Sequence, residues 1–178
     1  MSQTVLAPER APVFDGGAEC RRILFVCTGN TCRSPMAAAL LNHLSRPKEI
    51  CSAMAEQGRP VYHASSAGLY APEGAPISAN AALALERAGV VPVPGEDYTA
   101  HRARTVTAEM VALADEVVGL TGAHAMELLM RFPEAASKIR TLPADISDPF
   151  GGDLACYEAC LAQLKRCLEQ TYFAGGVQ

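Results

Sequence analysis

The sequence predicts an α/β protein in which a parallel sheet is covered by helices on both faces. Short apolar segments alternate along the chain with longer segments of helical character, which is the pattern of successive βαβ units. The first apolar segment, residues 23–26, contains no polar residue, as expected of a parallel strand that is buried on both faces. With 178 residues, the chain is long enough for one domain with a full hydrophobic core.

The helix after the first strand is expected over residues 36–41, which are mostly strong helix formers. Ser34 is a favourable N-cap, and Pro35 suits the first helical position. Pro47 can begin a further helical segment that extends to residue 55. Residues 61–65 alternate weakly between apolar and polar side chains, so they are assigned to the second strand.

Capping and turn residues define the remaining elements. Gly89 ends a helix that begins at Ser78, and Thr107 caps the next helix. Residues 90–95 contain two prolines and cannot form a central strand. The third and fourth strands are assigned to 116–121 and 139–142, further helices to 123–131 and 154–173, and a loop to 145–152.

The composition is that of an ordinary globular protein, with 49% hydrophobic and 19% charged residues. A net charge of −4 gives no support to binding of nucleic acid or of an anionic membrane surface. No apolar run approaches the length of a membrane span, and the N-terminus lacks the pattern of a signal peptide. Seven irregularly spaced cysteines fit a reducing compartment. We therefore expect a cytoplasmic protein.

Residues 1–19 differ in character from the rest of the chain. They contain Pro8, Pro12 and two adjacent glycines at 16 and 17. This composition is typical of a poorly ordered extension. We therefore divide the chain into an extension, 1–19, and a domain, 20–178.

The segment between the first strand and its helix has the features of a phosphate-binding loop. Backbone amides that precede a helix point toward a bound anion, and the helix dipole adds to their effect. Gly29 permits backbone conformations that other residues avoid, and Asn30 tolerates the left-handed region. Arg33 can close the loop with a bidentate contact to phosphate oxygens. The candidate phosphate-binding residues are Thr28, Gly29, Asn30, Thr31, Cys32, Arg33 and Ser34.

Cys27 lies where the first strand ends, at the base of this loop. The helix dipole and Arg33 both favour the thiolate form of a cysteine that is held there. A thiolate below a bound phosphate is placed for nucleophilic attack on phosphorus. The alternative, a buried cysteine beside a glycine turn, is less consistent with this arrangement. We therefore assign catalytic roles to Cys27 and Arg33.

The pattern Cys-(five residues)-Arg-Ser directly after the first strand resembles that of the low-molecular-weight protein phosphatases. This family includes protein tyrosine phosphatases and bacterial protein arginine phosphatases, and the loop from Cys27 to Ala37 looks closest to the arginine-directed branch. The resemblance covers residues 22–173 and implies a three-layer αβα sandwich with a four-stranded parallel sheet. It also implies hydrolysis of phosphorylated protein side chains through a phosphocysteine, without a cofactor or metal ion.

Attack by the thiolate requires an acid that protonates the leaving group. Asp148 and Pro149 match the family's Asp-Pro pair, on a loop after the last strand. We expect Asp148 to protonate the leaving atom and then to activate the water that releases the phosphate. Pro149 stiffens the loop. Asp145 is the alternative acid, and Asp-Pro alone is a common turn.

Two further residues are expected to support the loop. Ser66 lies in a Ser-Ala-Gly segment that the family commonly has, and its hydroxyl can hydrogen-bond to the loop. A plain turn explains this segment equally well. His101 matches the family's histidine that orients the loop asparagine, here Asn30. The alternative is a surface histidine near a basic turn.

Two positions bear on the substrate. The tyrosine-directed branch usually has an aliphatic residue where this chain has Thr31, and it often has aromatic residues after the Asp-Pro pair. Here Phe150 is followed by two glycines, so the aromatic wall is thinner. A threonine hydroxyl can hydrogen-bond to a guanidinium, which an aliphatic side chain cannot do. Both features favour phosphoarginine, and phosphotyrosine is the alternative.

The resemblance implies that Cys32 can form a reversible disulfide with Cys27 and so protect it from over-oxidation. Cys156, Cys160 and Cys167 fall near one face of the last helix, where burial in the core is favoured over a metal site.

Two rival functions are less consistent with the sequence. An arsenate reductase of the same fold needs a relay of cysteines in mid-chain, and none lies between Cys51 and Cys156. A non-catalytic phosphate-binding module would not need Asp148 together with Cys27. The sequence does not indicate the oligomeric state or the substrate protein.

Overall fold

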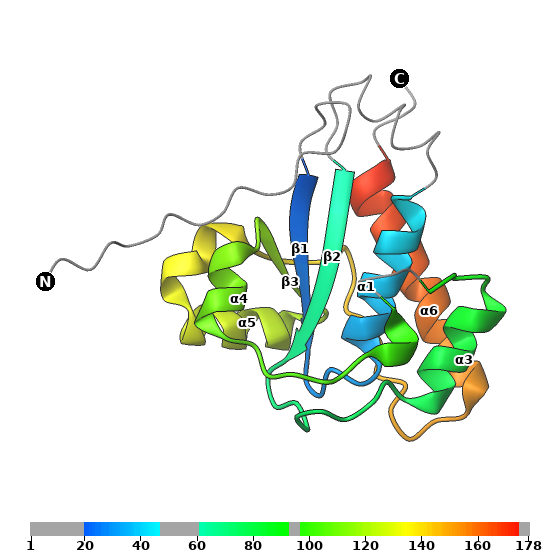
Figure 1. Cartoon of the computed structure of the whole chain (residues 1–178). Coiled ribbons are helices and arrows are strands. Elements are labelled where there is room, and N and C mark those ends of the chain that lie inside the picture. The colour runs from blue at the N-terminus through cyan, green and yellow to red at the C-terminus, as the bar shows by residue number, and fades with distance from the viewer. Residues whose placement is uncertain (1–19, 47–60, 93–96, 175–178) are drawn as a thin grey trace, which may run out of the picture.

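The computed structural model describes residues 20–46, 61–92 and 97–174. The predicted α/β class is confirmed, because a four-stranded parallel sheet lies between two layers of helices (Figure 1). The strand order is β2-β1-β3-β4. The strands are β1 (Cys20–Cys27), β2 (Val61–Gly68), β3 (Glu116–Gly119) and β4 (Ile139–Thr141).

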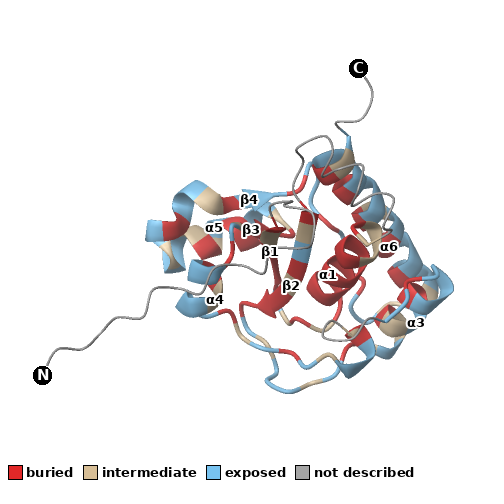
Figure 2. Ribbon diagram, turned by 45° about the horizontal axis from the view of Figure 1, so that its top comes forward, coloured by how far each residue is buried: buried red, intermediate tan, exposed pale blue. Residues whose placement is uncertain are grey.

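One face of the sheet is covered by α1, α3 and α6, and the other face by α4 and α5 (Figures 1 and 2). Two short 3₁₀ helices and a π-helical turn that continues α6 complete the described elements. The bounds are α1 (Arg33–Leu44), α3 (Ala79–Arg87), η1 (Tyr98–Ala100), α4 (Ala108–Leu113), α5 (Gly122–Arg131), η2 (Pro133–Lys138), α6 (Leu154–Leu168) and η3 (Glu169–Phe173).

Strand β1 is the centre of the fold because it is buried on both faces. Ile23 and Phe25 belong to the core beneath α1, α3 and α6, whereas Leu24 and Val26 belong to the core beneath α4 and α5. None of the four side chains is more than 1% exposed. Full burial of such a side chain contributes about 1.5–3 kcal/mol. The end of this strand, and with it Cys27, is therefore fixed by packing from both sides.

The predicted boundaries hold for most elements. Gly89 has φ 74 and directly follows the C-cap residue of α3, as a glycine at a helix end should. The Thr107 hydroxyl accepts a hydrogen bond from the Met110 N–H at 3.2 Å and so caps α4. Strand β2 continues to Gly68, three residues beyond the predicted end. The expected extension at 1–19 and the helical segment at 47–55 lie outside the described residues.

The expected start of the helix after the phosphate-binding loop was wrong. Helix α1 begins at Arg33 with Cys32 as its N-cap residue, so Ser34 lies inside the first turn instead of capping it. The Ser34 hydroxyl is occupied by contacts with the loop, described below. The expectation that Asn30 takes the left-handed region is confirmed by its φ of 54, whereas Gly29 does not have a positive φ. An asparagine tolerates this conformation better than most residues.

Two glycines allow neighbouring segments to approach this loop and α5 closely. A Cβ atom on Gly68 would lie 2.8 Å from the Thr28 carbonyl oxygen, and one on Gly119 would lie 2.6 Å from the Ala125 nitrogen. Both distances are too short for real atoms, so a larger residue would push the segments apart. The end of β2 therefore packs directly against the loop, and the start of α5 packs against the end of β3.

Candidate active site

The predicted phosphate-binding loop connects the carboxyl end of β1 to the start of α1 (Figure 1). This is the edge of a parallel sheet at which such folds bind ligands. The segment that directly follows β2 forms backbone hydrogen bonds with the start of the loop. Leu69 N donates to the Cys27 carbonyl oxygen and Tyr70 N to the Thr28 carbonyl oxygen, both at 2.9 Å.

Cys27 is placed at the base of the loop with only 2% of its surface exposed. Its Sγ lies 3.1 Å from Ser34 Oγ, which is in the first turn of α1. Ser34 Oγ also donates to the Ala67 carbonyl oxygen at 3.2 Å, so the favourable partial charge near the sulfur comes from the N-terminus of the helix.

Asn30 is fully buried and fixes the loop through its side chain. Its Nδ2 donates to Ser34 Oγ and to Ser66 Oγ, each at 3.0 Å. Its Oδ1 accepts a hydrogen bond from Arg104 N at 2.9 Å. Ser66 therefore contacts the loop, as the sequence suggested, and Arg104 is a partner that sequence reasoning missed.

His101 contacts Asn30 through the backbone, because its Nε2 lies 2.8 Å from the Asn30 carbonyl oxygen. A carbonyl oxygen only accepts hydrogen bonds, so Nε2 carries a proton and donates it. Burial lowers the pKa of His101 below its ordinary value, while the bond to Asn30 acts in the opposite direction. The ring thus supports the loop's main chain, whereas serines 34 and 66 and Arg104 orient the asparagine side chain.

Arg33 and Asp148 form an ion pair, with Nη2 and Oδ2 separated by 2.6 Å. The arginine side chain is 7% exposed and the aspartate side chain 51% exposed. Arg33 Nη1 also donates to the Ile146 carbonyl oxygen at 3.4 Å. The guanidinium therefore connects the loop after β1 to the loop after β4, which brings the predicted clamp and the predicted acid together.

The two candidate acids differ in their surroundings. Asp145 Oδ1 accepts the Gly122 N–H at 2.8 Å, which ties this carboxylate to the start of α5. Asp148 lies beside Arg33, and its Oδ1 accepts the Phe150 N–H at 3.1 Å. Pro149 is buried, whereas Phe150 is 78% exposed. The geometry favours Asp148 as the acid, with the ring of Phe150 facing solvent.

Thr31 and Cys32 form the far side of the loop. Thr31 Oγ1 lies 3.6 Å from Cys32 Sγ, and the Thr31 carbonyl oxygen accepts the Ser78 N–H at 2.8 Å. Cys32 is buried, with its Sγ 3.4 Å from the Tyr157 hydroxyl, which accepts a hydrogen bond from Ser78 Oγ. Helix α6 thereby reaches the loop through Tyr157, a residue that sequence reasoning did not single out.

The cysteines of α6 do not share one environment. Cys160 and Cys167 are buried as predicted, but Cys156 is exposed, which corrects the expectation for that residue. Burial raises the pKa of Cys160 to about 12, so its thiol stays protonated and unreactive. Among the described residues, no three His, Cys, Asp or Glu side chains are grouped as a metal site requires.

His124 is another residue that sequence reasoning missed. Its Nε2 lies 3.0 Å from Thr28 Oγ1, so it contacts the loop from α5. The sequence does contain a signal for this position. Thr121 follows the third strand as the N-cap of the next helix, and His124 lies three residues later, in the first turn of that helix. The carboxyl ends of neighbouring parallel strands lie at the same edge of the sheet. Residues that follow the third strand are therefore expected beside the loop that follows the first strand.

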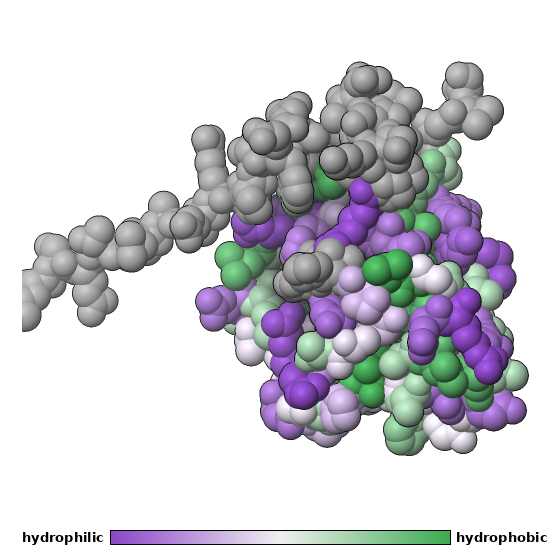
Figure 3. All heavy atoms as spheres, turned by 45° about the vertical axis from the view of Figure 1, so that its right-hand side comes forward, coloured by the Kyte–Doolittle hydropathy of each residue, from purple (hydrophilic) through white to green (hydrophobic). Residues whose placement is uncertain are grey.

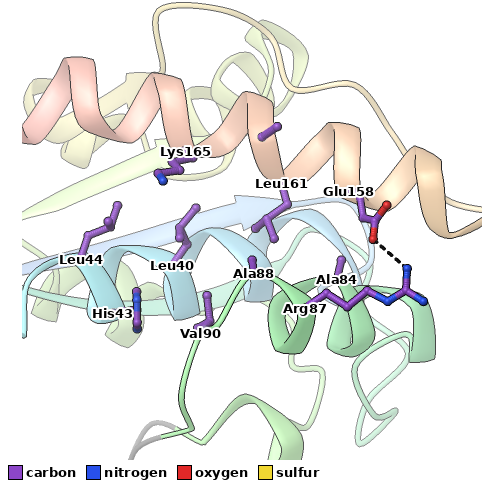
Figure 4. Close-up of a pocket in the computed structure, with 11 residues that line it drawn as sticks. Leu40, His43, Leu44, Ala84, Arg87, Ala88, Val90, Glu158, Leu161 and Lys165 are labelled. Carbon is purple, nitrogen blue, oxygen red and sulfur yellow. Dashed lines mark hydrogen bonds and ion pairs between the residues drawn. The ribbon is translucent and has the colours of Figure 1, made fainter.

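A separate groove lies between α1, α3 and α6, toward the end of α1 that is remote from Arg33 (Figure 4). Its volume is about 340 Å³, and its walls include Leu40, His43 and Leu161. Arg87 and Glu158 form an ion pair of 3.2 Å across its rim. Hydrophilic and hydrophobic residues are mixed over the face that α3 and α6 form (Figure 3). The loop residues described above contribute nothing to this groove.

Comparison with known proteins decides the family. Residues 22–174 match the family model described as low molecular weight phosphotyrosine protein phosphatase. The chain belongs to this family. The resemblance seen in the sequence is thereby confirmed, and the protein is a cysteine-dependent protein phosphatase.

Similar members of the family carry two kinds of name. A protein-arginine-phosphatase of Geobacillus stearothermophilus is 37% identical over 156 residues, covering 84% of this chain and 92% of the relative. A probable low molecular weight protein-tyrosine-phosphatase, EpsP, of Ralstonia nicotianae is 31% identical over 150 residues, covering 82% and 90%.

Solved structures of the family share the fold. The YwlE arginine phosphatase from Geobacillus stearothermophilus superimposes with a TM-score of 0.69 at 36% identity, covering 84% of this chain and 89% of the other. A low molecular weight protein tyrosine phosphatase from T. tengcongensis gives a TM-score of 0.69 at 34% identity, covering 84% and 96%. In the described part of the phosphatase, no helix has the length and apolar character needed to cross a membrane.

Proposed function

We propose that this phosphatase hydrolyses phosphorylated side chains of proteins through a phosphocysteine at Cys27, and that it prefers phosphoarginine. The observation that carries the preference is the hydroxyl of Thr31 within the phosphate-binding loop. The arginine phosphatase of Geobacillus stearothermophilus, at 37% identity, supports the same assignment.

In the first step, the loop amides from Thr28 to Ser34 and the guanidinium of Arg33 bind the phosphoryl oxygens. The Cys27 thiolate attacks phosphorus, the S–P bond forms, and the bond from phosphorus to the side-chain nitrogen or oxygen breaks. Asp148 donates its proton to the departing atom, so that a neutral guanidine or phenol group leaves.

In the second step, the Asp148 carboxylate takes a proton from water, and the resulting oxygen nucleophile attacks the phosphocysteine. The S–P bond breaks, inorganic phosphate leaves, and the Cys27 thiolate and the Asp148 acid are regenerated. No cofactor enters the balance. The chain needs only a nucleophile, an anion clamp and one carboxyl group that alternates between acid and base.

The ion pair between Arg33 and Asp148 connects the anion clamp to the acid. Arg33 Nη2 lies 2.6 Å from Asp148 Oδ2. A phosphoryl dianion competes for the same guanidinium donors. When substrate binds, Arg33 turns from Asp148 to the phosphoryl oxygens, and the Asp148 carboxyl is then released to approach the leaving atom.

The preference for phosphoarginine follows from the polarity of the group behind phosphorus. In phosphoarginine that group is a planar guanidine with N–H donors, whereas in phosphotyrosine it is an oxygen on an apolar ring. The Thr31 hydroxyl can accept from the guanidine, and an aliphatic side chain would leave a donor unpaired at a cost of about 1–3 kcal/mol. This corresponds to a preference on the order of 10- to 100-fold in kcat/KM.

Replacing Thr31 with isoleucine is expected to move the preference from phosphoarginine toward phosphotyrosine. The measurement is kcat/KM for matched phosphoarginine and phosphotyrosine peptides with both proteins. Thr31→Ser keeps the hydroxyl and is the control for the change in shape, so it should retain the original preference. A wild type that prefers phosphotyrosine, or a ratio that isoleucine leaves unchanged, would show that Thr31 is not the selector.

Phosphotyrosine is the second candidate substrate, because two exposed aromatic residues can also pack against a phenyl ring. Phe150 is 78% exposed and Tyr70 is 64% exposed, and Tyr70 follows directly on the segment that holds the loop. An aromatic ring can stack on either a phenyl group or a guanidinium, so these residues alone do not discriminate. The peptide comparison above decides between the two substrates.

Mild peroxide is expected to inactivate the enzyme reversibly through a disulfide between Cys27 and Cys32. Peroxide oxidises the Cys27 thiolate to a sulfenic acid, which condenses with the Cys32 thiol and releases water. A thiol reductant then restores both thiols. Activity should return in the wild type, whereas Cys32→Ser should lose activity irreversibly. Mass spectrometry that finds Cys27 unpaired in the reversibly inactivated enzyme would contradict this mechanism.

A further inference from the structure

His124 approaches the phosphate-binding loop from the helix layer opposite to α1. It lies in the first turns of α5, and only 6% of the residue is exposed. Both ring nitrogens have a threonine partner: Nε2 is 3.0 Å from Thr28 Oγ1, and Nδ1 is 3.0 Å from Thr121 Oγ1. The reaction steps described above use neither this ring nor the Thr28 hydroxyl.

The ring is neutral at neutral pH. Burial is the main cause that lowers the pKa of His124 below its ordinary value, and the positive charge of Arg33 acts in the same direction. The carboxylates of Asp148, Glu127 and Asp145 oppose the shift without reversing it. A neutral imidazole has one nitrogen that donates and one that accepts.

The hydrogen bonds of Thr121 favour one of the two tautomers. Its Oγ1 already accepts the backbone N–H of His124 at 3.2 Å, as the N-cap of α5. The Thr121 hydroxyl proton therefore needs an acceptor, and Nδ1 is within reach. The ring proton then resides on Nε2 and is donated to Thr28 Oγ1. With this tautomer, the hydroxyl proton that the ring does not accept belongs to Thr28, which is exposed. With the other tautomer it would belong to Thr121, which is half-buried.

We propose that His124 is a positioning residue, which fixes the Thr28 hydroxyl so that it donates a hydrogen bond to the substrate phosphoryl group at Cys27. Thr28 directly follows Cys27, and its backbone is held by Tyr70 N and by the close approach of Gly68. A hydroxyl that is already oriented loses little freedom when substrate binds. The inference rests on the hydrolysis at Cys27 proposed above.

Four single variants test this assignment. Thr28→Val removes the hydroxyl and is expected to lower kcat/KM about 3- to 10-fold for a phosphoarginine peptide and for para-nitrophenyl phosphate. It should raise the inhibition constant of inorganic phosphate by a similar factor, because the lost contact is to the phosphoryl group. Thr28→Ser keeps the hydroxyl and should stay close to wild type.

The histidine variants distinguish donation from packing. His124→Leu fills the space without a donor and should show the same loss as Thr28→Val. His124→Gln carries an amide N–H at a similar reach and should retain most of the activity. The double variant Thr28→Val/His124→Leu should lose no more than either single variant, since both remove one contact.

His43→Leu provides the matched control, because His43 lies in the groove remote from the loop (Figure 4). It should leave kcat/KM and the phosphate inhibition constant unchanged. Additive losses in the double variant would overturn the proposal, and so would a Thr28→Val enzyme with an unchanged inhibition constant. Thr28 is exposed, so its variants decide the question even if His124→Leu fails to fold.

Failure of this inference can be told apart from failure of the proposed function. A wild type that hydrolyses para-nitrophenyl phosphate but not phosphoarginine would overturn the proposed substrate and leave the Thr28 comparison intact. A wild type that hydrolyses both, with a Thr28→Val variant equal to it in rate and in phosphate binding, would overturn the role of His124 alone.

Discussion

Replacing Cys27 with serine is expected to abolish turnover while phosphate binding survives. The serine hydroxyl is a far weaker nucleophile than a thiolate, so kcat should fall by on the order of 10⁴-fold or more. The amide cradle, Arg33 and the buried Asn30 that fixes the loop are all retained. Hydrolysis of para-nitrophenyl phosphate and calorimetric titration with inorganic phosphate measure the two properties separately.

Cys156→Ser is the control for this substitution, because Cys156 is an exposed thiol on α6 that the reaction does not use. It should keep full activity. Trapping a phosphate on Cys27 of the wild type by rapid acid quench would support the covalent step directly. Appreciable turnover by Cys27→Ser would rule that step out, and binding without turnover in the wild type would identify a non-catalytic phosphate-binding module.

Replacing Asp148 with alanine is expected to lower kcat about 10²- to 10⁴-fold, the usual range for loss of a general acid. Asp148→Asn should show the same loss, because an amide fills the same space but cannot deliver the proton. The loss should shrink for substrates whose leaving group departs without protonation. The measurement is kcat for a series of aryl phosphates with leaving groups of different basicity.

Asp145→Asn is the matched control, since Asp145 is the neighbouring carboxylate bound to Gly122 N. It should keep kcat close to the wild-type value. A uniform loss across all leaving groups in Asp148→Ala would argue against proton donation. An equal loss in Asp145→Asn would transfer the acid role to the other carboxylate.

The fold could be predicted from the sequence because its signals are local. The apolar run before Cys27, the loop and the helix formers after it specify one strand, one turn and one helix. Repetition of that pattern then specifies a parallel sheet. The helix caps at Thr107 and Gly89 were also predictable, because each depends on one residue and its nearest neighbours in the chain.

The errors arose where tertiary contacts compete with local preference. Ser34 has the side chain of a good N-cap, but its hydroxyl contacts Cys27 and Asn30, so the helix begins without it. The pairing of Arg33 with Asp148 was not foreseen either. The sequence assigns Arg33 to the phosphate oxygens and Asp148 to the leaving atom, and it gives no sign that the two side chains form an ion pair.

His124 and Tyr157 were missed because a histidine or tyrosine near a helix start has many ordinary roles. What distinguishes them is the partner each one meets in space, Thr28 for the histidine and Cys32 for the tyrosine. No spacing rule connects these positions along the chain. Only the order of the strands, which places β3 next to β1, brings α5 to the loop.

The hydrogen bonds that hold the phosphate-binding loop have a consequence for how the enzyme folds. The hydrogen bonds that brace it join residues 36, 71, 96 and 125 positions apart in the chain. A contact between residues so far apart closes a long stretch of chain into a loop, which costs conformational entropy. We therefore expect these contacts to form late in folding. The phosphate-binding loop therefore has its working shape only after both helix layers have docked on the sheet. A partly folded chain therefore carries the nucleophile without an organised phosphate cradle.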